Sequence, residues 1–92
     1  MFEKLKQFRD LRNQAKTLQA ALAQETVTVN RHGVSLTLDG NLKVTALTVD
    51  LAVTAQQLQI NLAGLLNDAI GQAQRKAAQK MQQMGGLKGL GL

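Results

Sequence analysis

The 92-residue sequence predicts an α+β protein (α-β-β-β-α) in which a long helix, a three-stranded antiparallel β-meander and a second long helix follow one another. Two changes in the period of the apolar residues support this order. The period is that of a helix in residues 2–24, of strands in residues 25–50, and of a helix again in residues 55–83. The length allows one domain. We assign it to residues 1–84 and expect the Gly-rich residues 85–92 to form a flexible tail.

The first helix carries a regular apolar seam. Its members recur at alternating intervals of three and four residues: Phe8, Leu11, Ala15, Leu18 and Leu22. This spacing is typical of a helix that packs along its length on another element. Such a helix is about 33 Å long, whereas a compact domain of this size has a radius of gyration near 12 Å. We therefore expect part of the helix to project.

Alternation of apolar and polar residues predicts the three strands. The apolar positions are Val27 and Val29 in the first, Val34, Leu36 and Leu38 in the second, and Leu47 and Val49 in the third. Asp39-Gly40 is expected to form a two-residue turn between the second and third strands, with positive φ at both positions. Residues 30–33 form the earlier loop. The sheet is therefore predicted to be an antiparallel meander.

The third strand shows a slip in phase. Leu42, Val44 and Ala46 alternate out of step with Leu47 and Val49. Either a β-bulge resets the phase or another subunit covers the second face. The chain also has only two aromatic residues with which to fill a core, so a monomer of this size would bury little surface. We expect a homodimer, with Leu42 and Val44 as candidates for the extra buried face.

The second helix begins with a recognisable signal. Thr54 followed three residues later by Gln57 is typical of a capping box. An apolar stripe follows, formed by Leu58, Leu62, Leu65, Leu66, Ala69, Ile70, Ala73, Ala77 and Met81. Gly64 and Gly71 interrupt the stripe's helix and weaken it by roughly 0.5–1 kcal/mol each relative to Ala.

The net charge of +5 is concentrated towards the two ends of the sequence. Residues 1–24 carry five basic and two acidic residues, and residues 69–92 carry four basic residues and no acid. Residues 25–68, in contrast, carry two basic and four acidic residues. This asymmetry favours a polyanionic partner, nucleic acid before membrane.

The basic residues that we expect to contact DNA lie on both helices: Lys6, Arg9, Arg12, Lys16, Arg75, Lys76 and Lys80. On the first helix, Lys6, Arg9 and Lys16 fall opposite the apolar seam, and Arg12 lies between the two faces. An ordinary solvated face explains this ridge about as well as DNA contact does. For the second helix, attraction of cations to the helix C-terminus is an equally good explanation. Phosphate contact needs only donors, without exact side-chain geometry.

The sequence does not favour an enzyme. No Cys is present, which removes disulfides, thiol chemistry and Cys-based zinc sites and indicates a reducing compartment. His32, Ser35 and Asp39 lie close in sequence, but an alternating hairpin does not bring them together as a triad. We expect no catalytic residues, no metal, no cofactor and no small-molecule substrate. Too few aromatic residues are present for base stacking.

Neither a secretory segment nor a membrane span is expected. Basic residues interrupt the N-terminus before an apolar run can form, and polar residues interrupt the longest charge-free stretch, residues 51–67. The sequence therefore predicts a soluble cytoplasmic protein.

Several short motifs, in order, carry a resemblance to a known family. They are the initial Met-Phe before a Gln/Lys-rich helix, Leu38-Asp39-Gly40, Leu47-Thr48-Val49-Asp50, Leu65-Leu66-Asn67-Asp68-Ala69 and the Met- and Gly-rich tail. Together they resemble the YbaB/EbfC family of bacterial nucleoid-associated proteins. The resemblance implies a homodimer joined through the sheet region, with long helices projecting like tweezers. It also implies binding of double-stranded DNA with little sequence preference, a place at the nucleoid and a role in chromosome organisation.

Two other functions remain open at this point. The helices could serve as docking surfaces for a protein partner, in which case binding would be insensitive to salt. They could also bind RNA, because phosphate contacts alone do not distinguish RNA from DNA.

Overall fold

The computed structural model describes residues 2–85 and has the expected order of elements, α-β-β-β-α. They are α1 (Phe2–Ala23), β1 (Thr26–Arg31), β2 (Val34–Asp39), β3 (Val44–Val49) and α2 (Ala55–Gln83). The strands form one antiparallel sheet in the order β1-β2-β3, so the predicted meander is confirmed. Of the tail predicted over residues 85–92, all but Gly85 lies outside the described residues.

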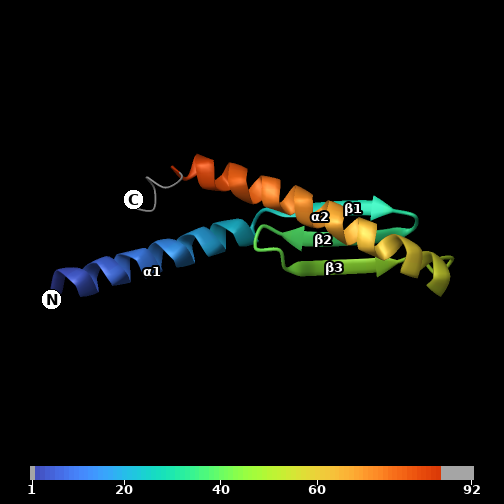
Figure 1. Cartoon of the computed structure of the whole chain (residues 1–92), viewed down its shortest axis with the longest axis horizontal. Helices are drawn as coiled ribbons and strands as arrows, with labels where there is room; N and C mark the ends of the chain where they lie inside the picture. Colours follow the sequence, from blue (N-terminus) through green and yellow to red (C-terminus); the bar gives the residue numbers. More distant parts are fainter. Residues whose placement is uncertain (1, 86–92) are drawn as a thin grey trace.

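The core lies between the sheet and α2, which crosses one face of the sheet over β1 and β2 (Figure 1). Its buried members are Val27, Val29, Val34, Leu36 and Leu38 from the strands and Leu65, Ala69 and Ala73 from α2. The strand residues alternate along β1 and β2, and the helix residues recur every four positions, so both predicted periods face this core. Two of the three helix residues are alanines, whose small side chains let α2 lie close to the sheet.

The start of α2 is fixed by the predicted capping box. The Thr54 hydroxyl accepts a hydrogen bond from the Gln57 backbone N–H at 3.1 Å, and the Gln57 side-chain oxygen accepts one from the Thr54 N–H at 3.0 Å. Two N–H groups at the helix start are thereby satisfied.

A β-bulge in β3 accounts for the slip in its apolar phase. Leu38 pairs with Val44, but the next residue back along β2, Thr37, pairs with Ala46, so Thr45 is an extra residue. Directly paired residues share a face of the sheet. The bulge therefore brings Val44 onto the face of Leu47, the face that α2 partly covers. Of the two explanations open at the sequence level, the bulge is confirmed.

The predicted position of the two-residue turn is wrong. The turn with two positive φ angles lies between β1 and β2, at His32 (φ 52°) and Gly33 (φ 81°). β2 and β3 are joined instead by the four residues 40–43, in which Leu42 has the positive φ, 63°.

The reason is that the β2–β3 loop also closes the C-terminal end of α1. The Gly40 N–H donates to the Leu22 carbonyl at 2.9 Å, and the Asn41 side-chain amide donates to the Gln19 carbonyl at 3.0 Å. One carboxylate oxygen of Asp39 accepts the N–H groups of Asn41 and Lys43, at 2.8 and 3.0 Å. These bonds hold a wider loop than the Asp-Gly signal predicts.

Beyond this junction α1 projects, as expected. The described chain measures 61 × 21 × 18 Å and has a radius of gyration of 17.8 Å, against about 12 Å for a compact domain of this length. The apolar seam packs only near its C-terminal end, where Leu18 and Leu22 are half-buried. Leu5, Phe8 and Leu11 are exposed, Phe8 by 69%. The expectation that the seam packs along its whole length is not met within one chain.

We predict that Gly40→Ala destabilises the protein. A Cβ at this position would lie 2.7 Å from the Leu22 carbonyl oxygen, a backbone atom that cannot move without disturbing α1. The free energy of unfolding, measured with urea, should fall by about 1–3 kcal/mol.

Gly64→Ala is the matched control. The nearest atom to a Cβ there is Arg31 Nη1 at 3.8 Å, an ordinary contact. Since Gly64 lies in the middle of α2, Ala should stabilise the helix by about 0.5–1 kcal/mol. Equal effects of the two substitutions would contradict the close approach of Gly40 to α1.

Candidate nucleic-acid interface

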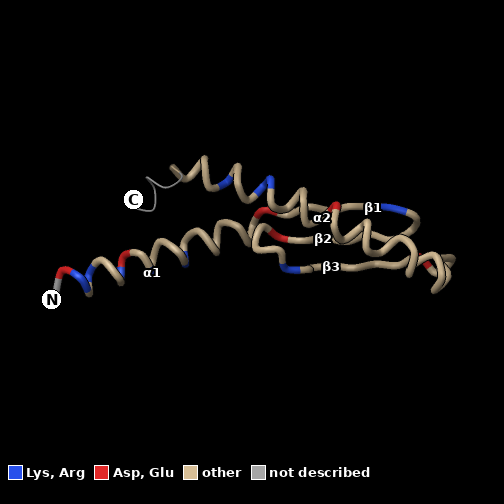
Figure 2. Tube along the Cα trace, in the orientation of Figure 1, with Lys and Arg blue, Asp and Glu red and all other residues tan. Residues whose placement is uncertain are grey.

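The basic residues predicted on α1 are all exposed. Lys6, Arg9, Arg12 and Lys16 lie along the projecting helix (Figure 2). Among residues 2–85, none of the four forms an ion pair, although Glu3 and Asp10 lie on the same helix. Their charges are therefore available to a partner. We call these four residues the α1 ridge.

The three basic residues predicted on α2 differ from one another. Arg75 is exposed and has no ion pair or hydrogen bond from its guanidinium within the described part of the chain. Lys76 donates from Nζ to the Thr26 carbonyl oxygen at 2.7 Å. Lys80 lies 3.5 Å from the carboxylate of Glu25. Lys76 and Lys80 therefore hold the C-terminal half of α2 beside the start of β1.

A third polar contact links α2 to the same strand further along. The Arg31 guanidinium, at the end of β1, donates to the Asp68 carboxylate at 2.9 Å. No local signal in the sequence points to these three contacts, because their partners are 37 to 55 residues apart. They resist rotation of α2 about its own axis, and so hold its basic residues in fixed directions.

The structure brings the two basic helices to one end of the molecule. α1 and the C-terminal half of α2 both extend from the same end of the sheet (Figure 1). The basic residues of α1 and α2 therefore lie on neighbouring projections (Figure 2). Asp39, the acid of β2, is buried.

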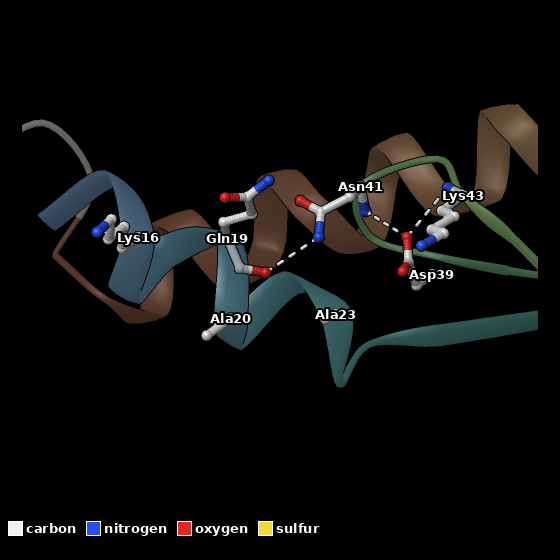
Figure 3. A pocket seen from close by; sticks show the side chains of 7 residues that line it. All are labelled: Lys16, Gln19, Ala20, Ala23, Asp39, Asn41 and Lys43. Carbon is white, nitrogen blue, oxygen red and sulfur yellow. Dashed lines mark hydrogen bonds between the residues drawn. The ribbon is translucent and has the colours of Figure 1, made fainter. Parts of the chain in front are cut away.

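A further basic residue joins this region in the fold. Lys43, in the β2–β3 loop, lines a groove of 590 Å³ together with Lys16 of α1 (Figure 3). The sequence placed Lys43 in the acidic middle segment and gave it no role. The only sequence signal that points to this loop is Asp39-Gly40, and this pair predicts a tight two-residue turn.

The structure does not bring His32, Ser35 and Asp39 together as a triad. His32 lies in the β1–β2 turn and Asp39 at the far end of β2, so the two do not converge with Ser35. Within residues 2–85 there is no group of three or more His, Asp or Glu side chains placed to hold a metal ion. Neither of the two helices in this range is apolar enough over a sufficient length to cross a membrane.

The described chain is thus an α-β-β-β-α protein whose two basic helices extend from one end of its sheet. The chain belongs to the YbaB/EbfC DNA-binding family, whose sequence model matches residues 1–88. The resemblance noted in the sequence is thereby confirmed. Membership supports a DNA-binding, nucleoid-associated role. No individual curated protein matches the chain.

We predict that Lys76 contributes to stability and that its neighbour Arg75 does not. Lys76→Met keeps most of the aliphatic side chain and removes the donor to Thr26. The free energy of unfolding should fall by about 0.5–1 kcal/mol, because a charged hydrogen bond is lost at an exposed site. Arg75→Met should change it by less than about 0.5 kcal/mol. Urea unfolding of the two variants side by side measures both, and an equal loss would show that the contact of Lys76 has no special weight.

Proposed function

We propose that the protein binds double-stranded DNA as a homodimer, through contacts to the phosphate backbone and with little preference for sequence. The observation that carries the proposal is the α1 ridge, whose four cations are exposed and have no ion pair within the described residues. On a solvated helix face, opposite charges three or four residues apart can pair with one another. Among the described residues, Glu3 and Asp10 form no ion pair with the α1 ridge. The four cations are therefore available to a polyanion.

The α2 cations add to this surface in different degrees. Arg75 has its full donor set available. Lys76 uses one of its three ammonium hydrogens on Thr26, so two remain for a phosphate oxygen. Lys80 shares its charge with Glu25. We therefore propose Lys6, Arg9, Arg12, Lys16, Arg75, Lys76 and Lys80 as phosphate contacts, with the α1 ridge as the main contributor.

Backbone recognition also fits what the side chains lack. Single-strand binding needs aromatic platforms on which bases stack. The chain has two Phe and neither Tyr nor Trp. Phosphate contacts, in contrast, are supplied by Lys and Arg on any exposed surface that follows the duplex. We accordingly propose a non-enzymatic protein that acts at the nucleoid.

The homodimer is proposed from the surface that α2 leaves uncovered. β3 is an edge strand, with one side free of partners in the sheet. Its apolar residues on the α2 side are well exposed, Val44 by 49%, Leu47 by 53% and Val49 by 41%. Leu42 nearby is exposed and has a positive φ, a conformation that costs a residue other than Gly about 1–3 kcal/mol. A second copy that covers Leu42 and β3 would bury this apolar strip.

The dimer can be tested by sedimentation equilibrium. The wild-type chain should sediment at twice its mass of 9.9 kDa at micromolar concentration. Leu47→Asp should abolish the dimer, because it places a charge in the covered strip. The variant should then sediment as a monomer or lose its structure. Thr48→Asp changes the neighbouring residue, which points to the opposite face of the sheet, and should stay dimeric. A stably folded wild-type monomer would refute the proposal.

DNA binding can be tested through its dependence on salt. Each dimer carries +10 formal charges, twice the +5 of one chain. The logarithm of the binding constant should fall with the logarithm of salt concentration by about 0.9 per neutralised phosphate. Replacing Lys6, Arg9 and Lys16 together by Gln should flatten this slope and leave the fold intact, since all three are exposed. Circular dichroism checks the fold, and scrambling the DNA sequence should change the affinity little.

If the triple variant keeps both the slope and the affinity of the wild type, the α1 ridge is only a solvated face and the assignment is wrong. Mobility-shift titrations with duplex DNA, single-stranded DNA and duplex RNA compare the three nucleic acids. We expect duplex DNA to bind most tightly, and tighter binding of duplex RNA would replace DNA by RNA as the partner.

A second candidate function rests on the exposed end of the α1 seam. Leu5, Phe8 and Leu11 form an apolar strip that the chain itself leaves open. Such a strip could dock on a protein partner. Binding of that kind depends on apolar burial and changes little with salt, so the salt titration distinguishes it from binding to phosphates.

A further inference from the structure

We propose that duplex DNA meets α2 on the side next to β1, where the Gln79 amide donates a hydrogen bond to a backbone phosphate in a groove that Arg75 and Lys76 also line. This inference rests on the proposed function, because it names the face of α2 that belongs to the same interface. It also adds an uncharged residue, Gln79, to a set that otherwise holds only cations.

A groove of 260 Å³ lies between α2 and β1, and we call it the α2–β1 groove. Its lining residues are Val27 of β1 and Gln72, Arg75, Lys76 and Gln79 of α2. The four helix residues stand at positions i, i+3, i+4 and i+7. Side chains three or four residues apart are neighbours on a helix, with about 5–6 Å between their Cβ atoms, and four at these positions surround one hollow. Helix geometry therefore makes both cations neighbours of Gln79.

The groove offers hydrogen-bond donors, one of them held in place. Lys76 Nζ donates to the Thr26 carbonyl oxygen at 2.7 Å, which holds the ammonium group beside β1 before a ligand arrives. An ammonium group has three N–H donors, so two remain for a ligand. Gln79, almost one turn further along α2, is exposed, and its amide carries two more N–H donors. Phosphate oxygens accept hydrogen bonds from both kinds of group.

The acids that lie near the groove already have partners. One oxygen of Asp68 accepts from the Arg31 guanidinium at 2.9 Å, and the other accepts from the Gln72 amide at 3.4 Å. The Glu25 carboxylate lies 3.5 Å from Lys80 Nζ. No carboxylate is among the residues that line the α2–β1 groove. Its positive charge is therefore not compensated within residues 2–85, as binding of an anion requires.

Arg75 extends the positive surface outwards from the groove. Its Nη1 lies 3.9 Å from the position that a Cβ on Gly71 would take. The guanidinium therefore extends back along the helix, over a residue without a side chain. In this position it adds positive charge next to the phosphate that Gln79 binds, on the same side of α2.

The other side of α2 offers a phosphate much less. Gln74 lies five residues before Gln79, which places it about 140° round the helix. It is exposed, but none of the residues three or four positions away from it is charged. The α2–β1 groove, at 260 Å³, is also smaller than the roughly 300–1,000 Å³ of sites for small organic ligands. A single phosphate of the duplex backbone is the ligand that fits it.

Two glutamate variants test which side of α2 meets the DNA. Gln79→Glu places a negative charge in the groove, and Gln74→Glu places the same charge on the other side of the same helix. Fluorescence anisotropy with a fluorescein-labelled duplex DNA at low salt measures both. Gln79→Glu should weaken binding about tenfold, and Gln74→Glu less than about threefold, with a difference that shrinks as salt is added. Both residues are exposed, so circular dichroism should show an unchanged fold.

Two methionine variants test the hydrogen bond itself. Methionine has about the length of glutamine, removes the amide donors and leaves the charge of the chain unchanged. Gln79→Met should weaken binding to the same duplex about threefold to tenfold at low salt, because a hydrogen bond to a charged group is lost. Gln74→Met should bind as the wild type does. The pair separates the amide contact from the general effect of charge on α2.

Each outcome decides the inference. If Gln79→Glu and Gln74→Glu weaken binding equally, or if Gln79→Met binds as the wild type does, the contact of Gln79 is refuted while the proposed function stands. If the wild-type protein binds no duplex DNA, the proposed function itself fails and this inference with it.

Discussion

The bond between the β2–β3 loop and the end of α1 is the contact on which the shape of the molecule depends. Carbonyl groups near the C-terminal end of a helix can accept bonds from outside the helix. Here the Gly40 N–H donates to the Leu22 carbonyl and the Asn41 side chain donates to the Gln19 carbonyl. The direction in which α1 leaves the sheet is therefore set by a loop that lies 18 or more residues further along the chain. A glycine is required at this point because the loop backbone approaches the α1 backbone more closely than a Cβ permits.

The same junction explains why a buried acid occurs in a basic region. Asp39 is the buried charged residue of the described chain, and its carboxylate is bound to two N–H groups of its own loop. A carboxylate so satisfied can stay buried at low cost. It gives the loop its width and places Lys43 beside α1. The acid thus contributes to a positively charged groove through the backbone geometry that it stabilises.

The position of α2 over β1 and β2 divides the basic and apolar surfaces of the chain. Lys76, Lys80 and Asp68 tie α2 to the β1 side. The apolar core lies between α2 and the strands β1 and β2, and β3 keeps its apolar residues exposed. A three-stranded sheet covered by one helix has too little core to hide all of its apolar residues. The exposed strip on β3 is the consequence, and none of the residues that we propose to contact DNA lies on that strand.

Much of the fold follows from the sequence alone, because it depends on neighbours a few residues apart. The two periods predicted the helices and strands, and Thr54 and Gln57 predicted the start of α2. The slip in phase left two explanations for β3, a bulge or a second covered face, and the bulge is present. The exposed ridge of α1 also follows from helical spacing. The tertiary structure alone decided the rest: the tight turn at His32-Gly33, the wider loop after Asp39, the contacts of Lys76 and Lys80, and the groove that Lys16 and Lys43 both line. The loop, the lysine contacts and the groove depend on residues that are distant in the chain. At the loop, the Asp39-Gly40 pair gave a local signal for a tight turn, but long-range bonds to α1 overrode it. The tight turn lies at His32-Gly33 instead.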